Sequence, residues 1–172
     1  YTWLNPAWPV RLIDRERLYE AGPAVIVANH LSLLDILVLF RLQSHFKWVS
    51  KIENFRVPVI GWNMHLCGYI PLRRGDRQSV IAMFRQCDRV LAEGSSILMF
   101  PEGTRSASGR LRAFNSGAFQ IAARNRVPLQ PIIVRGTAEA LPKRGFVLQG
   151  RHAISVQILD PIPASEFADR DP

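Results

Sequence analysis

Short runs of apolar residues, bounded by turn-forming residues, recur along the chain and are typical of strands buried in a sheet. These runs lie at residues 24–28, 46–50, 69–72, 96–100, 129–134, 146–149 and 153–159. Between them, apolar residues recur at helical spacing over 33–42, part of 51–67, 77–93 and 116–124. The alternation predicts an α/β fold, with a single domain over 1–172 and a largely parallel or mixed central sheet flanked by helices.

The clearest helix is predicted over residues 77–93. Asp76 precedes it and can accept hydrogen bonds from its first N–H groups, and Gly94 follows it and can close its end. Six apolar residues are expected to share its buried face: Val80, Ile81, Phe84, Cys87, Val90 and Leu91.

Polar side chains gather after three of the predicted strands. They are Asn29 and His30 after 24–28, Arg73, Arg74 and Arg77 after 69–72, and Glu102, Thr104 and Arg105 after 96–100. In open α/β sheets, ligands bind outside the carboxyl ends of parallel strands, where loops and helix N-termini meet. If these strands are parallel, a histidine, acidic residues and several arginines share one edge of the sheet.

His30 and Asp35 are the first candidates for chemistry. On one continuous helix their side chains would point about 140° apart, so they can meet only if His30 lies in the turn before the helix. Asn29 and Ser32 favour such a turn. On spacing alone the favoured interpretation is structural, with Ser32 and Asp35 forming a capping box and His30 a polar loop residue. That interpretation is compatible with a contact between His30 and Asp35.

Such a contact would create a general base. Histidine can take the proton of an alcohol that attacks a carbonyl carbon, while a carboxylate on its other nitrogen fixes the tautomer and stabilises the imidazolium. The sequence contains no Gly-x-Ser-x-Gly elbow and no cysteine in the setting of a nucleophile. We therefore expect the attacking hydroxyl to come from a substrate.

Two further segments bring charge to the same edge. Phe100-Pro-Glu-Gly-Thr-Arg-Ser106 places Glu102 and Arg105 in a glycine-containing loop, and Gly68-Tyr-Ile-Pro-Leu-Arg-Arg74 ends in two arginines. Taken singly, the first is explained by a surface ion pair and the second by a solvated basic turn. Arginine also binds phosphate in a bidentate manner, and a glutamate can orient a hydroxyl or hold a neighbouring arginine.

Composition adds a charge bias. The 172 residues are 48% hydrophobic and 21% charged, which argues against a disordered chain, and the formal net charge is +8. This charge favours anionic partners such as nucleic acid, phosphorylated metabolites, acidic lipids or acidic carrier proteins. A nucleic-acid-binding domain is disfavoured, because the arginines follow strand ends and no nucleic-acid-binding motif is present. Cys67 and Cys87 are not in a metal-binding spacing and are expected to be small buried residues.

Membrane contact is predicted without a spanning segment, because no apolar run reaches the roughly 18–20 residues that cross a bilayer. The missing N-terminal Met suggests a segment before Tyr1, and residues 1–20 form a candidate membrane-proximal lead-in. Aromatic and basic candidates for interfacial surface are Trp3, Leu4, Trp8 and Arg11, and then Lys51, Phe55, Arg56, Val57 and Trp62. Val59 and Ile60 are expected to pack in the core instead.

Four segments occur in a fixed order: Asn29-His-Leu-Ser-Leu-Leu-Asp35, Gly68–Arg74, Phe100–Ser106 and Val127-Pro-Leu-Gln-Pro-Ile-Ile133. Together they resemble the four-block signature of the glycerolipid acyltransferases related to 1-acylglycerol-3-phosphate acyltransferase. The resemblance covers about residues 4–135 and includes Lys51, Pro58-Val-Ile-Gly61 and Phe114-Asn-Ser-Gly-Ala118. The spacing of His30 and Asp35 alone is unspecific, whereas its combination with FPEGTRS is specific for this family.

The resemblance implies that His30 is the catalytic base and Asp35 its partner. It implies that the acceptor is bound by Arg74, Glu102, Gly103, Thr104 and Arg105, with Arg73, Lys51 and Pro131 as further candidates. Pro131 would lie near the acyl or acceptor pocket, and the backbone N–H groups around Gly103 are candidate oxyanion donors.

The implied reaction moves a fatty acyl group from an acyl-CoA or acyl-carrier-protein thioester to the free hydroxyl of a lysolipid. The favoured acceptor is 1-acylglycerol-3-phosphate, which would give phosphatidic acid. No metal or other cofactor is expected. The expected partners are the lysolipid, the thioester donor and a membrane surface, with no nucleic acid. The expected location is the cytoplasmic face of a membrane, the inner membrane in a bacterium.

Two positions depart from the pattern of the family. The residue before Arg74, often acidic in the family, is Arg73, and the usual lysine after Phe114 is Asn115. Both positions belong to the presumed head-group region. A different acceptor, such as a lyso-ornithine lipid or another lysophospholipid, therefore stays an alternative.

Overall fold

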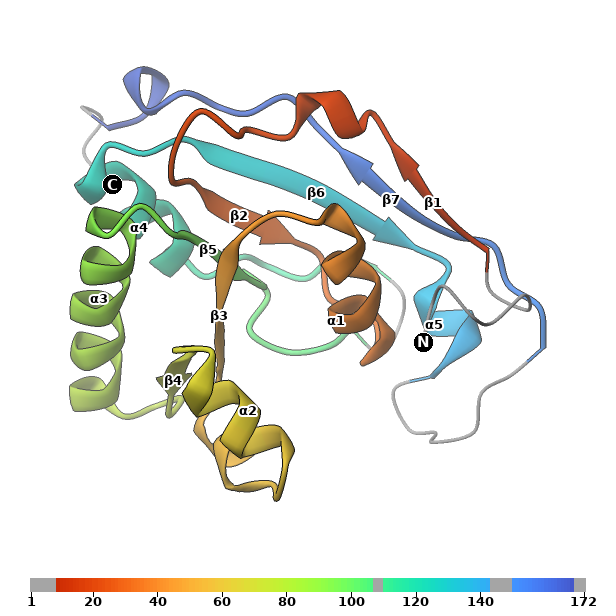
Figure 1. Cartoon of the computed structure of the whole chain (residues 1–172), viewed down its shortest axis with the longest axis horizontal. Coiled ribbons are helices and arrows are strands. Elements are labelled where there is room, and N and C mark those ends of the chain that lie inside the picture. The colour runs from red at the N-terminus through yellow and green to blue at the C-terminus, as the bar shows by residue number, and fades with distance from the viewer. Residues whose placement is uncertain (1–8, 107–109, 143–149, 169–172) are drawn as a thin grey trace.

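The computed structural model of the chain describes residues 9–106, 110–142 and 150–168. Within these residues one sheet has the strand order β1-β7-β6-β2-β5-β3-β4 (Figure 1). Its strands are β1 (Val10–Ile13), β2 (Val25–Ala28), β3 (Phe46–Lys51), β4 (Ile70–Leu72), β5 (Ser96–Met99), β6 (Leu129–Arg135) and β7 (Ile154–Ile158). The helices are α1 (Leu34–Leu39), α2 (Ile60–Leu66), α3 (Arg77–Ala92), α4 (Gly117–Asn125) and α5 (Thr137–Ala140). Turns of 3₁₀ helix lie at Arg15–Arg17, Phe40–Leu42, Ile52–Arg56 and Ala164–Glu166.

The sheet is mixed, as predicted. Its neighbouring strands are parallel except for β6 and β7, which are antiparallel. β2 lies in the middle of the sheet, and all four of its residues are buried. The predicted α/β fold with helices flanking a central sheet is therefore confirmed.

Most predicted elements are present, with one strand missed and one outside the described residues. The missed strand, β1, pairs in parallel with β7, Val10 lying opposite Ile154. It falls inside the segment 1–20 that we assigned to a lead-in, so Val10–Ile13 of this segment belongs to the sheet. The strand predicted at 146–149 and the surface predicted at Trp3, Leu4 and Trp8 lie outside the described residues.

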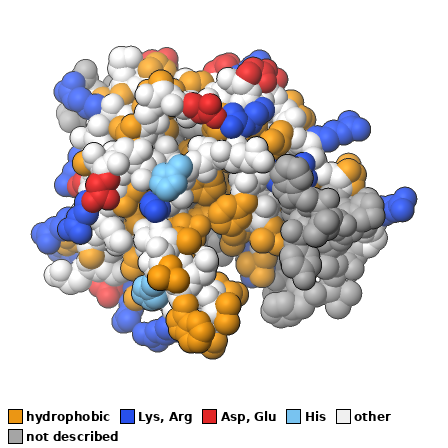
Figure 2. Space-filling view, in the orientation of Figure 1, with side chains coloured by type: hydrophobic (Ala, Val, Ile, Leu, Met, Phe, Trp, Pro, Cys, Tyr) orange, Lys and Arg blue, Asp and Glu red, His pale blue; other side chains and the backbone are white. Residues whose placement is uncertain are grey.

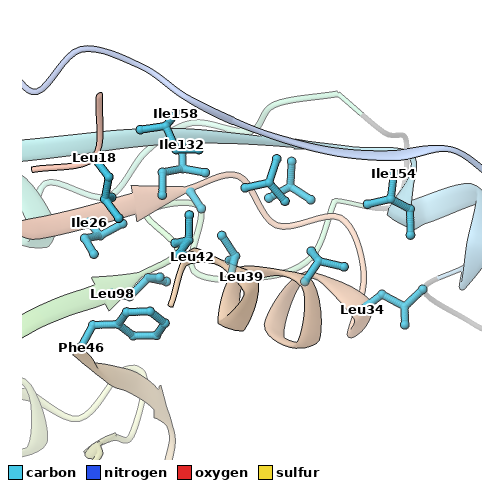
Figure 3. Packing of buried hydrophobic residues seen from close by; sticks show 14 of the residues in the cluster. Leu18, Ile26, Leu34, Leu39, Leu42, Phe46, Leu98, Ile132, Ile154 and Ile158 are labelled. Carbon is cyan, nitrogen blue, oxygen red and sulfur yellow. The ribbon is translucent and has the colours of Figure 1, made fainter. Parts of the chain in front are cut away.

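Two hydrophobic clusters cover the two faces of the sheet, because successive strand residues point to opposite faces. Ile26 and Ala28 of β2 belong to the cluster that also contains residues of α1 (Figure 3). Val25 and Val27 belong to the cluster that contains residues of α3 and α4. Each face of the central strand is thus sealed by helices, which leaves the ends of the strands for polar chemistry.

The caps predicted for α3 are confirmed, while its buried face is slightly rotated from the prediction. Asp76 accepts hydrogen bonds from the backbone N–H groups of Gln78 and Ser79, at 2.9 and 3.2 Å. Ile81 is 36% exposed, so its assignment to the buried face is wrong. Met83 is buried instead, because it lies one turn before Cys87 on the same face.

The two cysteines differ in their surroundings. Cys87 is fully buried, its Sγ lies 3.5 Å from the sulfur of Met83, and burial raises the pKa of its thiol to about 12. It is therefore the small buried residue that we predicted. Cys67 directly follows α2 and is partly exposed, so the same prediction is wrong there.

Candidate active site

Four strand ends meet at one edge of the sheet. β2, β5, β3 and β4 are consecutive and parallel, so their carboxyl ends point the same way (Figure 1). The residues that follow these strands were predicted to share an edge, and the topology confirms this arrangement. Lys51 at the end of β3 pairs with Leu72 at the end of β4, which places the arginines after β4 at that edge too.

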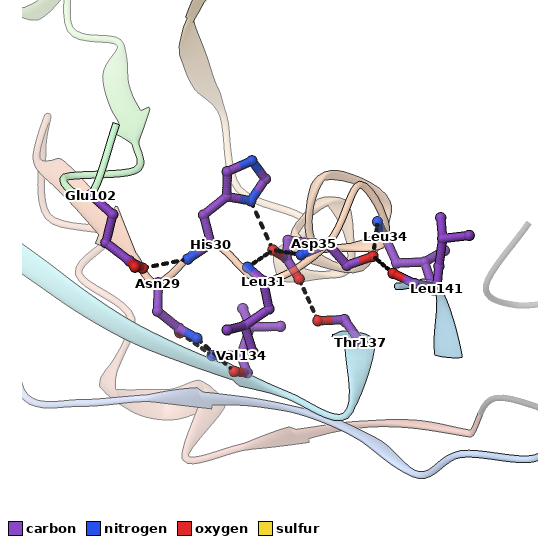
Figure 4. Close-up of polar contacts among 10 residues, drawn as sticks. Asn29, His30, Leu31, Leu34, Asp35, Glu102, Val134, Thr137 and Leu141 are labelled. Carbon is purple, nitrogen blue, oxygen red and sulfur yellow. Dashed lines mark hydrogen bonds and ion pairs between the residues drawn. The ribbon is translucent and has the colours of Figure 1, made fainter. Parts of the chain in front are cut away.

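His30 and Asp35 are in contact. The Nδ1 atom of His30 lies 2.8 Å from Oδ2 of Asp35 (Figure 4). α1 begins only at Leu34, so His30 lies in the turn before the helix while Asp35 lies in its first turn. This is the geometry that the five-residue spacing required.

The carboxylate of Asp35 is fully buried and organises the whole turn. Its Oδ2 also accepts hydrogen bonds from the backbone N–H groups of Leu31 at 2.6 Å and Ser32 at 2.8 Å. Its Oδ1 accepts one from the hydroxyl of Thr137 at 2.5 Å. One carboxylate therefore serves both the start of the helix and the imidazole, so the two interpretations of the sequence hold together.

Only half of the predicted capping box forms. The N–H of Ser32 donates to Asp35, but the Ser32 hydroxyl accepts a 3.3 Å bond from the N–H of Leu34. The same hydroxyl donates to the carbonyl oxygen of Leu141 at 2.6 Å. Ser32 thus ties the start of α1 to the segment after α5.

The buried carboxylate fixes the tautomer of His30. Because an ionised carboxylate only accepts hydrogen bonds, Nδ1 carries the proton in the neutral imidazole and Nε2 carries the lone pair. Nε2 has no hydrogen-bond partner in the described part of the chain. The ring stacks on Phe100, with centroids 3.9 Å apart and planes 8° from parallel. The imidazole of His30 is therefore held at Nδ1 and open at Nε2.

Glu102 holds the loop after β5 against this turn. It is only 5% exposed, and its Oε1 and Oε2 accept hydrogen bonds from the backbone N–H groups of His30 at 2.8 Å and Arg112 at 3.0 Å. The N–H of Ser106 donates to the carbonyl oxygen of His30 at 2.8 Å. A surface ion pair therefore does not describe Glu102, because its carboxylate is buried and bound to the backbone.

Gly103 makes the tight turn of this loop. Its φ of 68° favours glycine, and a Cβ atom there would lie 2.9 Å from the side-chain nitrogen of Asn115. Asn115 donates to the carbonyl oxygen of Pro101 through both its backbone and side-chain nitrogens, at 2.8 and 2.9 Å. Asn115, at the position where the family usually has a lysine, therefore stabilises the loop.

The N–H of Gly103 is not a free oxyanion donor. It donates to the carbonyl oxygen of Phe100 at 3.0 Å, inside the turn. The neighbouring N–H of Thr104 has no acceptor in the segments that the structure describes. Of the backbone groups around Gly103, Thr104 is thus the better candidate.

The remaining predicted residues lie farther along the edge or beside it. Arg73 and Arg74 are exposed, and the N–H of Arg73 donates to the hydroxyl of Ser79 at 2.8 Å. Lys51 forms an exposed ion pair with Glu53 at 3.3 Å. Arg105, which follows the Gly103 turn, is partly exposed. The roles assigned to these residues stay predictions.

Pro131 lies within the sheet instead of at its edge. It pairs with Val27 of β2, three positions before His30. Its carbonyl oxygen accepts a hydrogen bond from the N–H of Leu159 at 3.0 Å. A place near the acyl or acceptor pocket stays a prediction for this residue.

Three residues that support the pair were missed from the sequence. Thr137 is 102 positions from Asp35, and no local pattern connects them. Asn29 was read only as a turn residue, but its side chain bonds both the carbonyl oxygen and the N–H of Val134 on β6, at 2.9 and 2.7 Å. Phe100 is part of the FPEGTRS motif, but the motif does not predict that its ring stacks on His30.

No group of three or more His, Cys, Asp or Glu side chains gathers in the described residues as a metal site would need. No described helix is both long enough and apolar enough to cross a bilayer.

Known proteins resemble the chain in sequence and in fold. Residues 9–135 match the sequence model of the family described as Acyltransferase. The chain is 40% identical over 96% of its length to 1-acyl-sn-glycerol-3-phosphate acyltransferase of Chlamydomonas reinhardtii, and 41% identical over 95% to the chloroplastic LPAT1 enzyme of the same name in Arabidopsis thaliana. These matches cover 50% and 46% of the two relatives, so the chain spans about half the length of the curated relatives it matches.

A solved structure supports the same relationship. The crystal structure of the 1-acyl-sn-glycerophosphate acyltransferase PlsC from Thermotoga maritima superimposes with a TM-score of 0.82 and 25% sequence identity. The match covers 94% of this chain and 64% of that one. The family match over residues 9–135 includes His30, Asp35 and the loop of Glu102. This chain therefore belongs to the acyltransferase family.

Proposed function

We propose that the chain transfers a fatty acyl group from an acyl-CoA or acyl-carrier-protein thioester to the free hydroxyl of 1-acylglycerol-3-phosphate. The product would be phosphatidic acid, and no metal or other cofactor takes part. The observation that carries the proposal is the open Nε2 atom of His30, opposite an Nδ1 atom bound to buried Asp35. The names of the relatives support the choice of acceptor.

The proton moves in a closed cycle through His30. Nε2 takes the proton of the acceptor hydroxyl as its oxygen attacks the thioester carbonyl carbon, and Asp35 stabilises the imidazolium that forms. The tetrahedral intermediate then collapses, the carbon–sulfur bond breaks, and Nε2 returns the proton to the departing thiolate. The products are an ester and a free thiol, and His30 is restored.

The oxyanion of the intermediate needs donors that are already in place. We assign this role to the N–H of Thr104, which follows the turn that Gly103 and Asn115 build. Because Glu102 binds the backbone of His30, the same loop is held in register with the base. This contact supports a donor that is in place before substrate arrives.

The phosphate of the acceptor would bind to the arginines along the same edge. With strands about 4.8 Å apart, β4 lies roughly 14 Å across the sheet from β2. An arginine side chain after β4 and a head group whose hydroxyl is at His30 would together bridge this separation. We assign phosphate binding to Arg74 and Arg105, with Arg73 and Lys51 contributing positive charge.

A panel of acceptors tests the proposed substrate. With either thioester as donor, we expect kcat/KM for 1-acylglycerol-3-phosphate to exceed that for lysophosphatidylcholine or a lyso-ornithine lipid by at least about tenfold, since only the first offers a phosphate monoester to the arginines. Arg74→Gln should remove most of that preference by raising KM. A lyso-ornithine lipid as the best acceptor would overturn the choice of substrate and leave the acyl-transfer chemistry standing.

We also propose a surface that meets the membrane. Val57, Val59, Ile60, Trp62 and Leu66, here called the α2 surface, are exposed, with Leu66 87% and Val59 68% exposed. Figure 2 shows hydrophobic side chains gathered over α2, beside basic ones. The expectation that Val59 and Ile60 pack in the core is therefore wrong, and so is the assignment of Phe55 to the interfacial surface, because its side chain is buried.

The charges around the α2 surface match an anionic bilayer. Between Asn54 and Gly75 the chain has no acidic residue, while it contains Arg56, Arg73 and Arg74. An exposed apolar helix flanked by basic residues binds the interface of anionic membranes through apolar burial and charge together. A lysolipid acceptor would enter from such a membrane, on its cytoplasmic face, next to the edge that carries His30.

Vesicle binding checks this surface. We expect the double variant Trp62→Ser with Leu66→Ser to bind vesicles rich in phosphatidylglycerol at least about tenfold more weakly. The reason is that two apolar side chains are no longer available to be buried in the membrane. Ile162→Ser, at an exposed residue on the segment after β7, is the control and should bind like the wild type. Unchanged binding by the double variant would mean that another surface meets the membrane.

A further inference from the structure

Thr137 is the first residue of α5, and its hydroxyl contacts the carboxylate oxygen of Asp35 that does not face His30. Both Thr137 and Asp35 are fully buried, and their side chains are joined at 2.5 Å (Figure 4). Gly136 makes the turn from β6 into α5 with a φ of 82°. A Cβ atom there would lie 2.2 Å from the carbonyl oxygen of Ala153, so the turn depends on glycine.

A second contact fixes the same helix to the same turn. The hydroxyl of Ser32 donates to the carbonyl oxygen of Leu141, directly after α5. α5 is therefore tied to the segment 31–35 at both of its ends. Thr137 lies two positions beyond residues 9–135, the part that matches the family.

We propose that Thr137 is a positioning residue for the proton transfer at His30. This inference rests on the proposed function. Oδ2 of Asp35 already accepts from His30, Leu31 and Ser32, so the hydroxyl of Thr137 holds the other oxygen, Oδ1. With both oxygens held, the carboxylate cannot rotate about its Cβ–Cγ bond, and Oδ2 stays aimed at Nδ1.

The hydroxyl also moderates the charge of the carboxylate. A hydrogen bond to Oδ1 draws negative charge away from Oδ2, and its loss leaves more charge facing Nδ1. Without the hydroxyl, the protonated form of the pair, in which His30 is an imidazolium, is therefore favoured. The pair should therefore bind its proton at higher pH in a variant that lacks the hydroxyl.

Other charged groups on the elements around the pair remain in place in such a variant. They are Glu102 and Arg105 on the loop after β5, Arg41 after α1, Arg135 at the end of β6, and Glu139 on α5. Because these groups are common to the wild type and the variants, a difference in titration between them reports the hydroxyl.

The test compares Thr137→Val, which keeps the volume of the side chain, with Thr137→Ser, which keeps the hydroxyl. Ser96→Ala is the control for the loss of a buried hydroxyl, because Ser96 accepts a hydrogen bond from the N–H of Ala24 before β2 begins. For each protein, the titration of the His30 side chain is followed by ¹⁵N NMR. The pH dependence of kcat for acyl transfer is measured in parallel, and His30 is assigned by the signal that His30→Gln lacks.

We expect Thr137→Val to lower kcat about tenfold near neutral pH with KM within about twofold. The titration of His30 and the acid limb of the kcat profile should both move to higher pH. Thr137→Ser should restore both, and Ser96→Ala should lower thermal stability without moving either.

An unshifted titration in Thr137→Val would overturn the inference, and so would a shift of equal size in Ser96→Ala. The NMR titration does not need turnover, so the two proposals fail separately. A wild-type chain without acyl transfer, together with a shifted titration in Thr137→Val, would contradict the proposed function and support the role of Thr137.

Discussion

His30→Gln is expected to lower kcat for acyl transfer by about a thousandfold, because general base catalysis contributes about 10²–10⁴ to rate. Glutamine keeps a polar side chain of similar length but cannot take up a proton at Nε2. Since the side chain of His30 is only 13% exposed and sits on Phe100, its loss should also cost a little stability. The measurement is the rate of free thiol release at saturating thioester and acceptor.

His45→Gln is the matched control. His45 is exposed and bonds the hydroxyl of Ser95 at 3.1 Å, away from the edge that carries the site. It should keep wild-type kcat. A His30→Gln enzyme that retains more than about a tenth of wild-type kcat would show that another group removes the proton.

Asp35→Asn is expected to fold almost as well as the wild type and to lose about two to three orders of magnitude in kcat, within the contribution of general base catalysis. The amide oxygen can still accept from the N–H groups of Leu31 and Ser32, and its NH₂ group can donate to the hydroxyl of Thr137. A neutral amide cannot stabilise the imidazolium that forms during turnover, so the chemistry suffers more than the fold.

Asp35→Ala separates the structural from the catalytic role. It leaves two buried N–H groups without an acceptor, so it should be less stable than Asp35→Asn by about 2–4 kcal/mol in urea denaturation. Equal stability of the two variants would mean that the carboxylate does not organise the turn. Wild-type kcat in Asp35→Asn would remove Asp35 from the mechanism.

The contact between His30 and Asp35 could be predicted because it is local. The two residues are joined by a single turn, and the helix geometry allowed only one way for them to meet. Thr137 could not be found in this way, since its contact depends on how β6 turns into α5. The backbone contacts of Glu102 likewise depend on how two loops fold against each other.

Burial patterns explain which other elements could be predicted from the sequence and which could not. β2 could be predicted because it is buried on both faces, whereas β1 alternates partly buried with exposed residues and contains Arg11. Val59 and Ile60 were placed in the core because they belong to an apolar run. α2 packs instead through Gly61, where a Cβ atom would lie 2.0 Å from the carbonyl oxygen of Phe55, and this close contact turns its neighbours outward.

The stoichiometry of the products formed from 1-acylglycerol-3-phosphate and an acyl thioester tests directly whether a lysolipid hydroxyl is the nucleophile. Mass spectrometry measures phosphatidic acid and a thiol assay measures free thiol in the same reaction. For the wild type we predict one phosphatidic acid per thiol released, and for His30→Gln almost none of either. Thiol release without phosphatidic acid would show hydrolysis of the thioester in place of transfer, and would contradict the claim that a lysolipid hydroxyl is the nucleophile that His30 activates.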